Sequence, residues 1–320
     1  MSHFNRQHLS LVVKSSVSII LISYLFSVQL PNIHQIKSAM ISADPYLVLF
    51  AASLHIIGFY LCSLRWYLLL REHNAIFSIK TLAYSYLVGI FFNSFLPGTM
   101  SGDVVRAMDT AGKVGSLGRS ILIVFVERLT GMIALLMLVG VALLFGGPDV
   151  LGYQNIKIFL ILLTILIFIS LGFLFHPRGY DLIERMVEYF PISSVQQKLK
   201  KIAGSLFIFS GKGKVLGLCI LISILFQVVV VFHYWIIGKA LGIDIYWMLY
   251  FTIIPVSILV LMIPASINGI GLREQVFIFL LGNVGVSTVL AVSLAWIAFV
   301  IVLLQAVLGG VVFAIRKRSS

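Results

Sequence analysis

Long apolar stretches, separated by short polar segments, make up most of this 320-residue chain. Six of them are long enough to cross a bilayer as helices. They cover residues 15–30, 46–64, 119–146, 155–175, 215–242 and 286–315. Two further stretches, 79–96 and 246–263, each stop before a proline, which ends a helix because it has no backbone N–H. The pattern predicts an all-α polytopic membrane protein.

The composition supports this class. Hydrophobic residues make up 60% of the chain and charged residues only 11%. Soluble proteins contain about 25% charged residues, so a water-soluble fold is excluded. We expect residues 1–320 to form a single membrane domain.

The formal net charge of +12 comes mostly from lysines and arginines near the ends of the apolar stretches. Cytoplasmic loops of membrane proteins are rich in these residues, so the basicity indicates topology, and we expect no nucleic-acid partner. With a cytoplasmic N-terminus, the loops expected outside contain only Lys37 and Lys157. The loops expected inside carry Arg65, Arg71, Lys80, Lys113, Arg119, the segment 178–214 and the tail 316–318. Both termini are therefore predicted to be cytoplasmic.

This distribution requires each proline-ended stretch to return to the side from which it started. The sequence thus predicts about six full spans plus two re-entrant hairpins, broken by Pro and Gly, at about 79–118 and 246–283. It leaves open whether each hairpin crosses the bilayer fully or stops half way.

The two hairpin tips share a pattern. "LPGTMSGDVVRA" (96–107) and "IPASINGIGLRE" (263–274) align at Pro97 and Pro264, Gly102 and Gly269, and Arg106 and Arg273. The first copy enters from the cytoplasm and the second from outside, which predicts an inverted-topology repeat of the kind found in secondary transporters. Three identities in twelve positions also leave coincidence open.

A broken helix inside a membrane offers an anion site. Its second arm begins with backbone N–H groups and a positive dipole end, and an arginine one turn further on can bind a phosphate with two hydrogen bonds. We therefore predict that a lipid phosphate binds at the tips. The predicted contact residues are Ser101, Gly102, Arg106, Asn268, Gly269 and Arg273. Asn93, Ser94, Ser266 and Asn268 could equally cap the broken helices.

Further charges lie at the same depth. Glu127 and Arg128 are about two turns inside an apolar stretch, where unpaired charges are costly. We expect Glu127 to pair with a hairpin arginine, and Arg128 to pair with Asp103 or Glu274. Together with Arg106 and Arg273 these residues would form a neutral network that supports the site. Alternatively, the pairs only hold the helices together.

Polar residues elsewhere in the apolar stretches carry weaker signals. His55, Gln227 and His233 are expected to be interhelical hydrogen-bond partners, because no second ligand stands at metal-binding spacing. Cys62 and Cys219 are far apart in the sequence, and both lie within apolar stretches. The sequence therefore predicts no metal, no disulfide framework and no cofactor. The segment 178–214 predicts an amphipathic helix, suited either to an anionic leaflet or to packing across the bundle.

The segments "NSFLPGTMSGDVVRA", "ERLTG" and "PASINGIGLRE" follow one another along the chain. Together they resemble the membrane region found in lysylphosphatidylglycerol synthases and in many stand-alone flippase-like proteins, and the likeness covers about residues 15–315. A typical member has two glycines before the aspartate, and here Ser101 replaces the first. The resemblance implies movement of an anionic phospholipid or a polyprenyl-phosphate lipid between leaflets.

The expected function is therefore lipid flipping in a bacterial inner membrane. Catalytic patterns such as GxSxG, HExxH or a Walker loop do not occur in the sequence, which favours a transporter over an enzyme. Two alternatives stay open: a membrane-embedded lipid head-group transferase, and a non-transporting partner subunit of a cell-envelope lipid synthase. A lipid-modifying synthase partner and a homo-oligomer are also left open.

Overall fold

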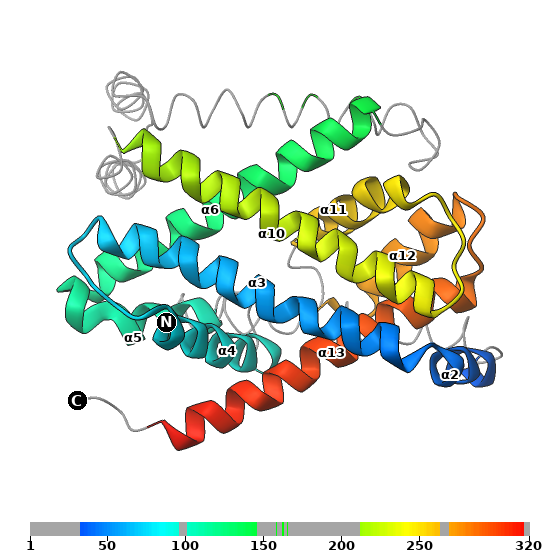
Figure 1. Cartoon of the computed structure of the whole chain (residues 1–320), viewed down its shortest axis with the longest axis horizontal. Helices are drawn as coiled ribbons and strands as arrows, with labels where there is room; N and C mark the ends of the chain where they lie inside the picture. The colour runs from blue at the N-terminus through cyan, green and yellow to red at the C-terminus, as the bar shows by residue number, and fades with distance from the viewer. Residues whose placement is uncertain are drawn as a thin grey trace, which may run out of the picture.

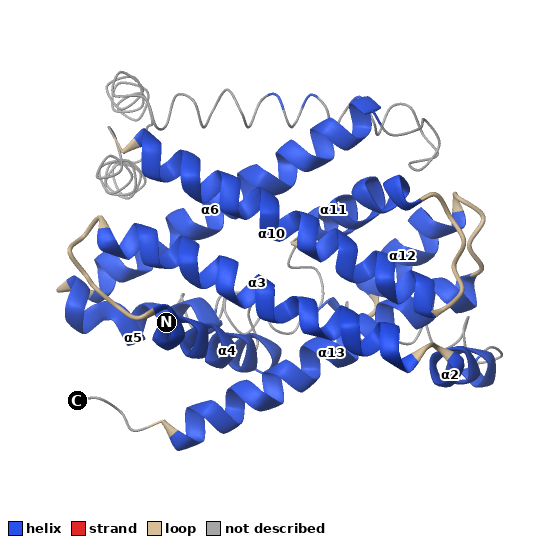
Figure 2. Cartoon of the chain, viewed as in Figure 1, coloured by secondary structure: helices blue, strands red, loops and turns tan. Residues whose placement is uncertain are grey.

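The computed structural model describes residues 33–95, 101–145, 158, 162, 165, 212–262 and 269–316. All regular structure in these ranges is helical (Figures 1 and 2). The predicted helical class is thereby confirmed for this part of the chain, whereas the number of spans and the inverted repeat stay predictions. The expected spans 15–30 and 155–175 lie outside the described residues, apart from three single positions in the second. The amphipathic segment 178–214 also lies outside them, except for 212–214.

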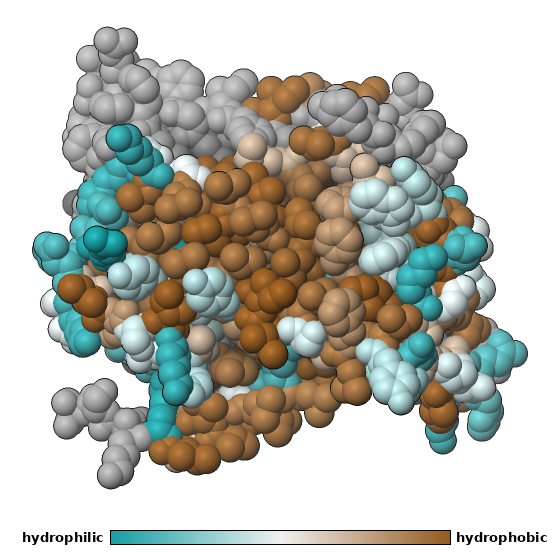
Figure 3. All heavy atoms as spheres, viewed as in Figure 1, coloured by the Kyte–Doolittle hydropathy of each residue, from teal (hydrophilic) through white to brown (hydrophobic). Residues whose placement is uncertain are grey.

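Four helices in the described ranges are long and apolar enough to cross a membrane. They are α3 (Pro45–Arg71), α6 (Leu117–Phe145), α10 (Gly213–Ala240) and α13 (Thr288–Ile315). Each coincides with a predicted apolar stretch. Figure 3 shows a broad hydrophobic band across the middle of the molecule, with hydrophilic residues towards both ends of the view. A band of this kind is expected of a surface that faces lipid.

Helix α3 begins where the sequence provides a cap. The carboxylate of Asp44 accepts hydrogen bonds from the backbone N–H groups of Tyr46 and Leu47, at 2.8 and 3.2 Å. Pro45 occupies the first helical position, where its missing N–H does no harm. A short helix, α2 (Ile33–Ser42), precedes α3 and packs against α13.

Helices α3 and α10 pack against each other along their length as an antiparallel pair (Figure 1). Arg65 contacts Ser223, and His55, ten residues earlier in α3, contacts His233, ten residues later in α10. Because an α-helix rises 1.5 Å per residue, these two contacts are about 15 Å apart along the pair.

Both proline-ended stretches form pairs of short helices. The first consists of α4 (Ile79–Phe95) and α5 (Ser101–Val114). The second consists of η2 (Trp247–Leu249) and α11 (Tyr250–Leu261), followed by α12 (Leu272–Gly282). Figure 1 shows the two pairs at opposite ends of the bundle. The prolines between the arms, at 97 and 264, lie outside the described residues.

Glycines allow the first pair to pack closely. A Cβ atom added at Gly102 of α5 would lie 2.0 Å from the carbonyl oxygen of Gly89 in α4. On α13, a Cβ atom at Gly309 would lie 2.0 Å from the carbonyl oxygen of Leu87. Small residues at helix interfaces let backbones approach each other in membranes. They fix the position of α4 between α5 and α13.

Two apolar cores hold the helix pairs. One gathers residues of α10, α11, α12 and α13 around Tyr250 and Phe277. The other gathers residues of α3, α4, α5, α6 and α10 around Trp66 and Leu69. Each broken helix pair therefore has its own core, and a polar cluster lies beside the second.

Candidate anion-binding site

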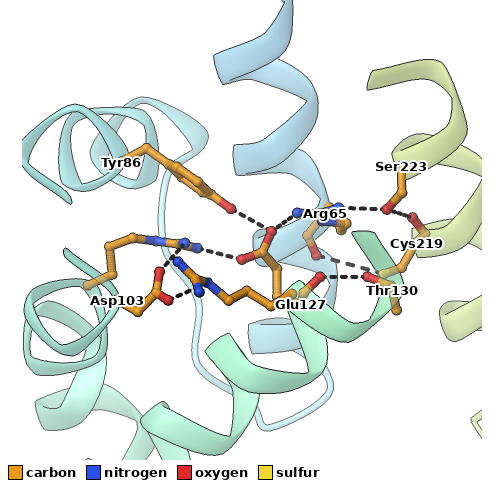
Figure 4. Close-up of polar contacts among 9 residues, drawn as sticks. Arg65, Tyr86, Asp103, Glu127, Thr130, Cys219 and Ser223 are labelled. Atoms are coloured by element: carbon orange, nitrogen blue, oxygen red, sulfur yellow. Dashed lines mark hydrogen bonds and ion pairs between the residues drawn. The ribbon is translucent and has the colours of Figure 1, made fainter. Parts of the chain in front are cut away.

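Glu127 of α6 lies at the centre of a buried ion cluster (Figure 4). Its Oε2 accepts a hydrogen bond from Arg106 Nη2 at 2.8 Å. Its Oε1 accepts one from the Tyr86 hydroxyl at 2.5 Å and another from Arg65 Nη2. The Glu127 side chain is only 1% exposed. One carboxylate thus joins helices α3, α4, α5 and α6 inside the apolar band.

Arg106 is held by aromatic rings as well as by charge. Its guanidinium carbon lies 3.5 Å from the centre of the Tyr86 ring and 4.4 Å from that of Trp66. Cations are attracted to ring faces, and the attraction reaches about 2 kcal/mol when the pair is desolvated. Gly89 leaves room for this side chain, since a Cβ atom there would lie 3.1 Å from Arg106 Cδ.

Asp103 connects the cluster to its edge. It accepts from Arg106 Nη1 at 3.4 Å across one helical turn, and it forms an ion pair with Arg128 Nε. The Asp103 side chain is 9% exposed, whereas that of Arg128 is 41% exposed. The expected pairs of Glu127 with a hairpin arginine and of Arg128 with Asp103 are therefore both present.

Arg65 is one of two cluster residues that the sequence pattern did not indicate. It was assigned to a cytoplasmic loop, but it lies inside α3, is 6% exposed, and donates from Nη1 to Ser223 Oγ at 2.6 Å. The apolar run "WYLLL", which directly follows Arg65, could have indicated that the helix continues beyond this residue. Tyr86 was also missed, because a tyrosine in an apolar stretch has no distinctive spacing.

The tip residues of the first pair have mostly structural contacts. Gly102 N–H donates to Asn93 Oδ1 at 2.7 Å, and the Ser101 hydroxyl donates to the Phe92 carbonyl at 3.0 Å. Asn93 therefore caps α5, which was one of its two expected roles. The Gly102 N–H that was predicted to bind a phosphate already has a partner within the protein.

The second helix pair does not join the cluster. The Arg273 guanidinium lies 4.9 Å from the centre of the Phe299 ring, and Glu274 accepts from Gly271 N–H at 2.8 Å. Gly269 adopts a positive φ of 75° at the start of this arm. Asn268 lies outside the described residues.

The structure brings together four residues of the expected network: Asp103, Arg106, Glu127 and Arg128. Arg65 adds to this group, whereas the contacts described for Arg273 and Glu274 are with Phe299 and Gly271. The supporting role of the network stays a prediction. Arg106 and Arg273 also lie on helices that are far apart (Figure 1). The reason is the fold, which places α5 and α12 at opposite ends of the bundle (Figure 1).

A cavity of about 330 Å³ opens beside the cluster. Residues of α3, α4, α5, α6, α10 and α13 line it, and they include both carboxylates and all three arginines of the cluster. At the far end from Arg65 it reaches His55 and Gln305. This volume is at the lower end of the range of about 300–1,000 Å³ found for small-molecule sites.

The cavity is cationic. Arg65, Arg106 and Arg128 face Asp103 and Glu127, which leaves one uncompensated positive charge among the described arginine and carboxylate side chains of its lining. In addition, the Nε–H groups of Arg65 and Arg106 are buried and have no acceptor in the described part of the chain. Unsatisfied buried donors are costly. An anion entering the cavity would supply the missing charge.

Comparison with known proteins supports the resemblance seen in the sequence. Residues 11–310 match the family described as "Lysylphosphatidylglycerol synthase TM region". No curated protein matches the chain, and no solved structure does.

Proposed function

Because the chain belongs to the lysylphosphatidylglycerol synthase TM region family, we propose that it binds the phosphate of an anionic lipid in the cavity and moves that lipid between leaflets. The observation that carries this proposal is the cationic cavity, lined by three arginines and two carboxylates, next to the break between α4 and α5. Secondary transporters bind substrates at such broken helices.

Charge indicates the class of head group. A phosphodiester carries one negative charge, which matches the single excess positive charge of the cavity. Phosphatidylglycerol-like phospholipids and polyprenyl phosphodiesters both have this group, and both keep an apolar tail that can stay in lipid. The proposed substrate class is therefore a lipid with a phosphodiester head group.

Each cluster residue has a distinct task in this proposal. Arg65 and Arg106 bind the phosphate, since a guanidinium presents its donors in a flat fork that suits phosphate oxygens. Tyr86 and Trp66 hold the plane of Arg106. Glu127 keeps both arginines in place while the cavity is empty.

Arg128 and Asp103 have a role at the edge. Their ion pair lies where the cavity lining is most exposed. A phosphate that approaches Arg128 competes with Asp103 for the guanidinium, so the pair can open to admit a head group. The proposed location is a bacterial inner membrane, with both termini in the cytoplasm.

Flipping can be measured with the full chain in vesicles of phosphatidylethanolamine and phosphatidylglycerol that contain a fluorescent phosphatidylglycerol. Dithionite quenches only the label in the outer leaflet, so its decay reports exchange between leaflets. We expect faster exchange than in protein-free vesicles. Arg65→Lys and Arg106→Lys should each slow it by about tenfold or more, because hydrogen bonds to charged groups contribute about 1.5–3 kcal/mol.

Arg316→Lys is the matched control. Arg316 also pairs with a carboxylate, Asp109, at 2.7 Å, but it does not line the cavity. Its variant should exchange lipid at the native rate. Exchange by the native protein no faster than in protein-free vesicles would refute flipping of this lipid. Head-group transfer in vesicles that contain donor and acceptor lipids would instead support a transferase.

A further inference from the structure

Two histidines meet inside the apolar band, away from the ion cluster. His55 Nε2 of α3 lies 3.5 Å from His233 Nε2 of α10, and the rings are T-shaped with centres 4.5 Å apart. The expected role of these residues as interhelical hydrogen-bond partners is thereby confirmed. Ionisable residues at this depth are costly, and they mark proton or ion pathways in membrane proteins.

The hydrogen bonds of the pair set the positions of its protons. His233 Nδ1 lies 2.9 Å from the Ala51 carbonyl oxygen, which can only accept, so Nδ1 carries a hydrogen. In a neutral His233 ring, Nε2 is then a bare acceptor. It faces His55 Nε2, which must donate. In the neutral pair, His55 therefore donates to His233, and His233 donates to the carbonyl oxygen of Ala51.

The pair can take up one further proton. Two charged imidazoliums at this distance would repel each other strongly, so a second proton is excluded. Gln305 of α13 lines the cavity together with His55. An amide can donate to a bare ring nitrogen or accept from an N–H, so Gln305 can accommodate both states of the ring.

His55 lines the same cavity as the ion cluster, whereas His233 is buried behind it. Across that cavity lie the charged and titratable groups of the neighbouring helices, namely Cys62 and Arg65 of α3, Tyr86 of α4, Asp103 and Arg106 of α5, and Glu127 and Arg128 of α6. Tyr234 adjoins His233 on α10, and Arg273 of α12 interacts with Tyr234. No carboxylate contacts the histidine pair among the described residues.

We propose that His55 and His233 form a single-proton site, and that proton uptake there is coupled to binding of a phosphate anion in the cavity. This inference rests on the proposed function, because it takes the cavity as the anion site. A proton on the pair adds one positive charge to the cavity lining. An anion therefore binds more tightly to the protonated form, and by linkage the bound anion favours protonation.

Proton linkage can be measured directly on the full chain in detergent. Isothermal titration calorimetry with dioctanoyl phosphatidylglycerol, in buffers of different ionisation enthalpy near pH 6.5, counts the protons taken up per anion bound. We expect uptake of a fraction of one proton by the native protein. His55→Gln and His233→Gln should reduce it to zero, because glutamine cannot carry the charge. His34→Gln removes an exposed histidine of α2 and should leave it unchanged.

The outcomes separate this inference from the proposed function. Binding of the lipid without proton uptake by the native protein overturns the proton site and leaves the anion site standing. Absence of binding overturns both. Thermal unfolding identifies any variant that fails to fold, and absence of uptake by the native protein overturns the proton site whether or not the variants fold. Unchanged proton uptake in a folded His55→Gln protein would also overturn the inference.

Discussion

Replacing Glu127 by glutamine tests whether one carboxylate holds the cluster together. The two side chains have nearly the same shape, so packing is preserved. The substitution removes the charge that compensates two guanidiniums, and it replaces one acceptor oxygen with an NH₂ group that faces an arginine or tyrosine donor. The variant should therefore fold less stably.

The expected loss of stability in Glu127→Gln follows from the burial of the side chains involved. The side chains of Glu127, Arg65 and Arg106 are 1%, 8% and 5% exposed, so solvent does not replace the lost partner. Breaking a buried pair on one side typically costs about 3–5 kcal/mol. The matched control is Asp109→Asn. Asp109 and its partner Arg316 are 23% and 28% exposed, and more exposed pairs contribute about 0–1 kcal/mol.

The free energy of unfolding can be measured for both variants by titrating sodium dodecyl sulfate into mixed micelles. Trp66 lies beside Arg106, so tryptophan fluorescence responds to the site itself. Glu127→Gln should lose several times more stability than Asp109→Asn. Equal losses, or a loss below about 1 kcal/mol for Glu127→Gln, would show that the cluster is not held by this carboxylate.

Two further predictions concern packing and topology. Gly102→Ala should destabilise the protein by about 1–3 kcal/mol, because the added Cβ atom meets Gly89 at 2.0 Å. Gly112→Ala, in the same helix but with nothing within 4 Å, should stabilise it by up to about 1 kcal/mol, and thermal unfolding compares the two. An impermeant maleimide added to intact cells should label Asp244→Cys but not Ile76→Cys, since these exposed residues lie at opposite ends of the α3 and α10 pair. Both native cysteines are buried, and labelling of Ile76→Cys from outside would contradict the orientation.

Much of the fold could be predicted because a membrane acts on each stretch of the chain separately. Apolar runs of sufficient length form helices long enough to span a membrane, which is why α6, α10 and α13 lie close to their predicted ranges and α3 covers its range and extends beyond it. Helices α4 and α11 end within three residues of Pro97 and Pro264, close to where the sequence indicated, although α11 also contains Pro255. The contact between Asp103 and Arg106 is equally local, since residues three apart share a helix face.

Membership of the candidate site depended on contacts between helices. The charges that meet are set by helix rotation and register, which close contacts such as Gly102 on Gly89 determine. These contacts bring Arg65 to Glu127 and keep Arg273 at the other end of the bundle. Residue types alone indicated a neutral group of charges, whereas the arrangement in space leaves the cavity with one positive charge.

The sequence by itself therefore determined that this is a helical membrane protein with two broken helices and several charges at membrane depth. Each of these properties depends on residues within a few turns of one another. Only the tertiary structure decided which arginines share Glu127, and that His55 meets His233 across two helices. Those contacts join residues far apart in the chain, and their geometry depends on how all the helices pack together.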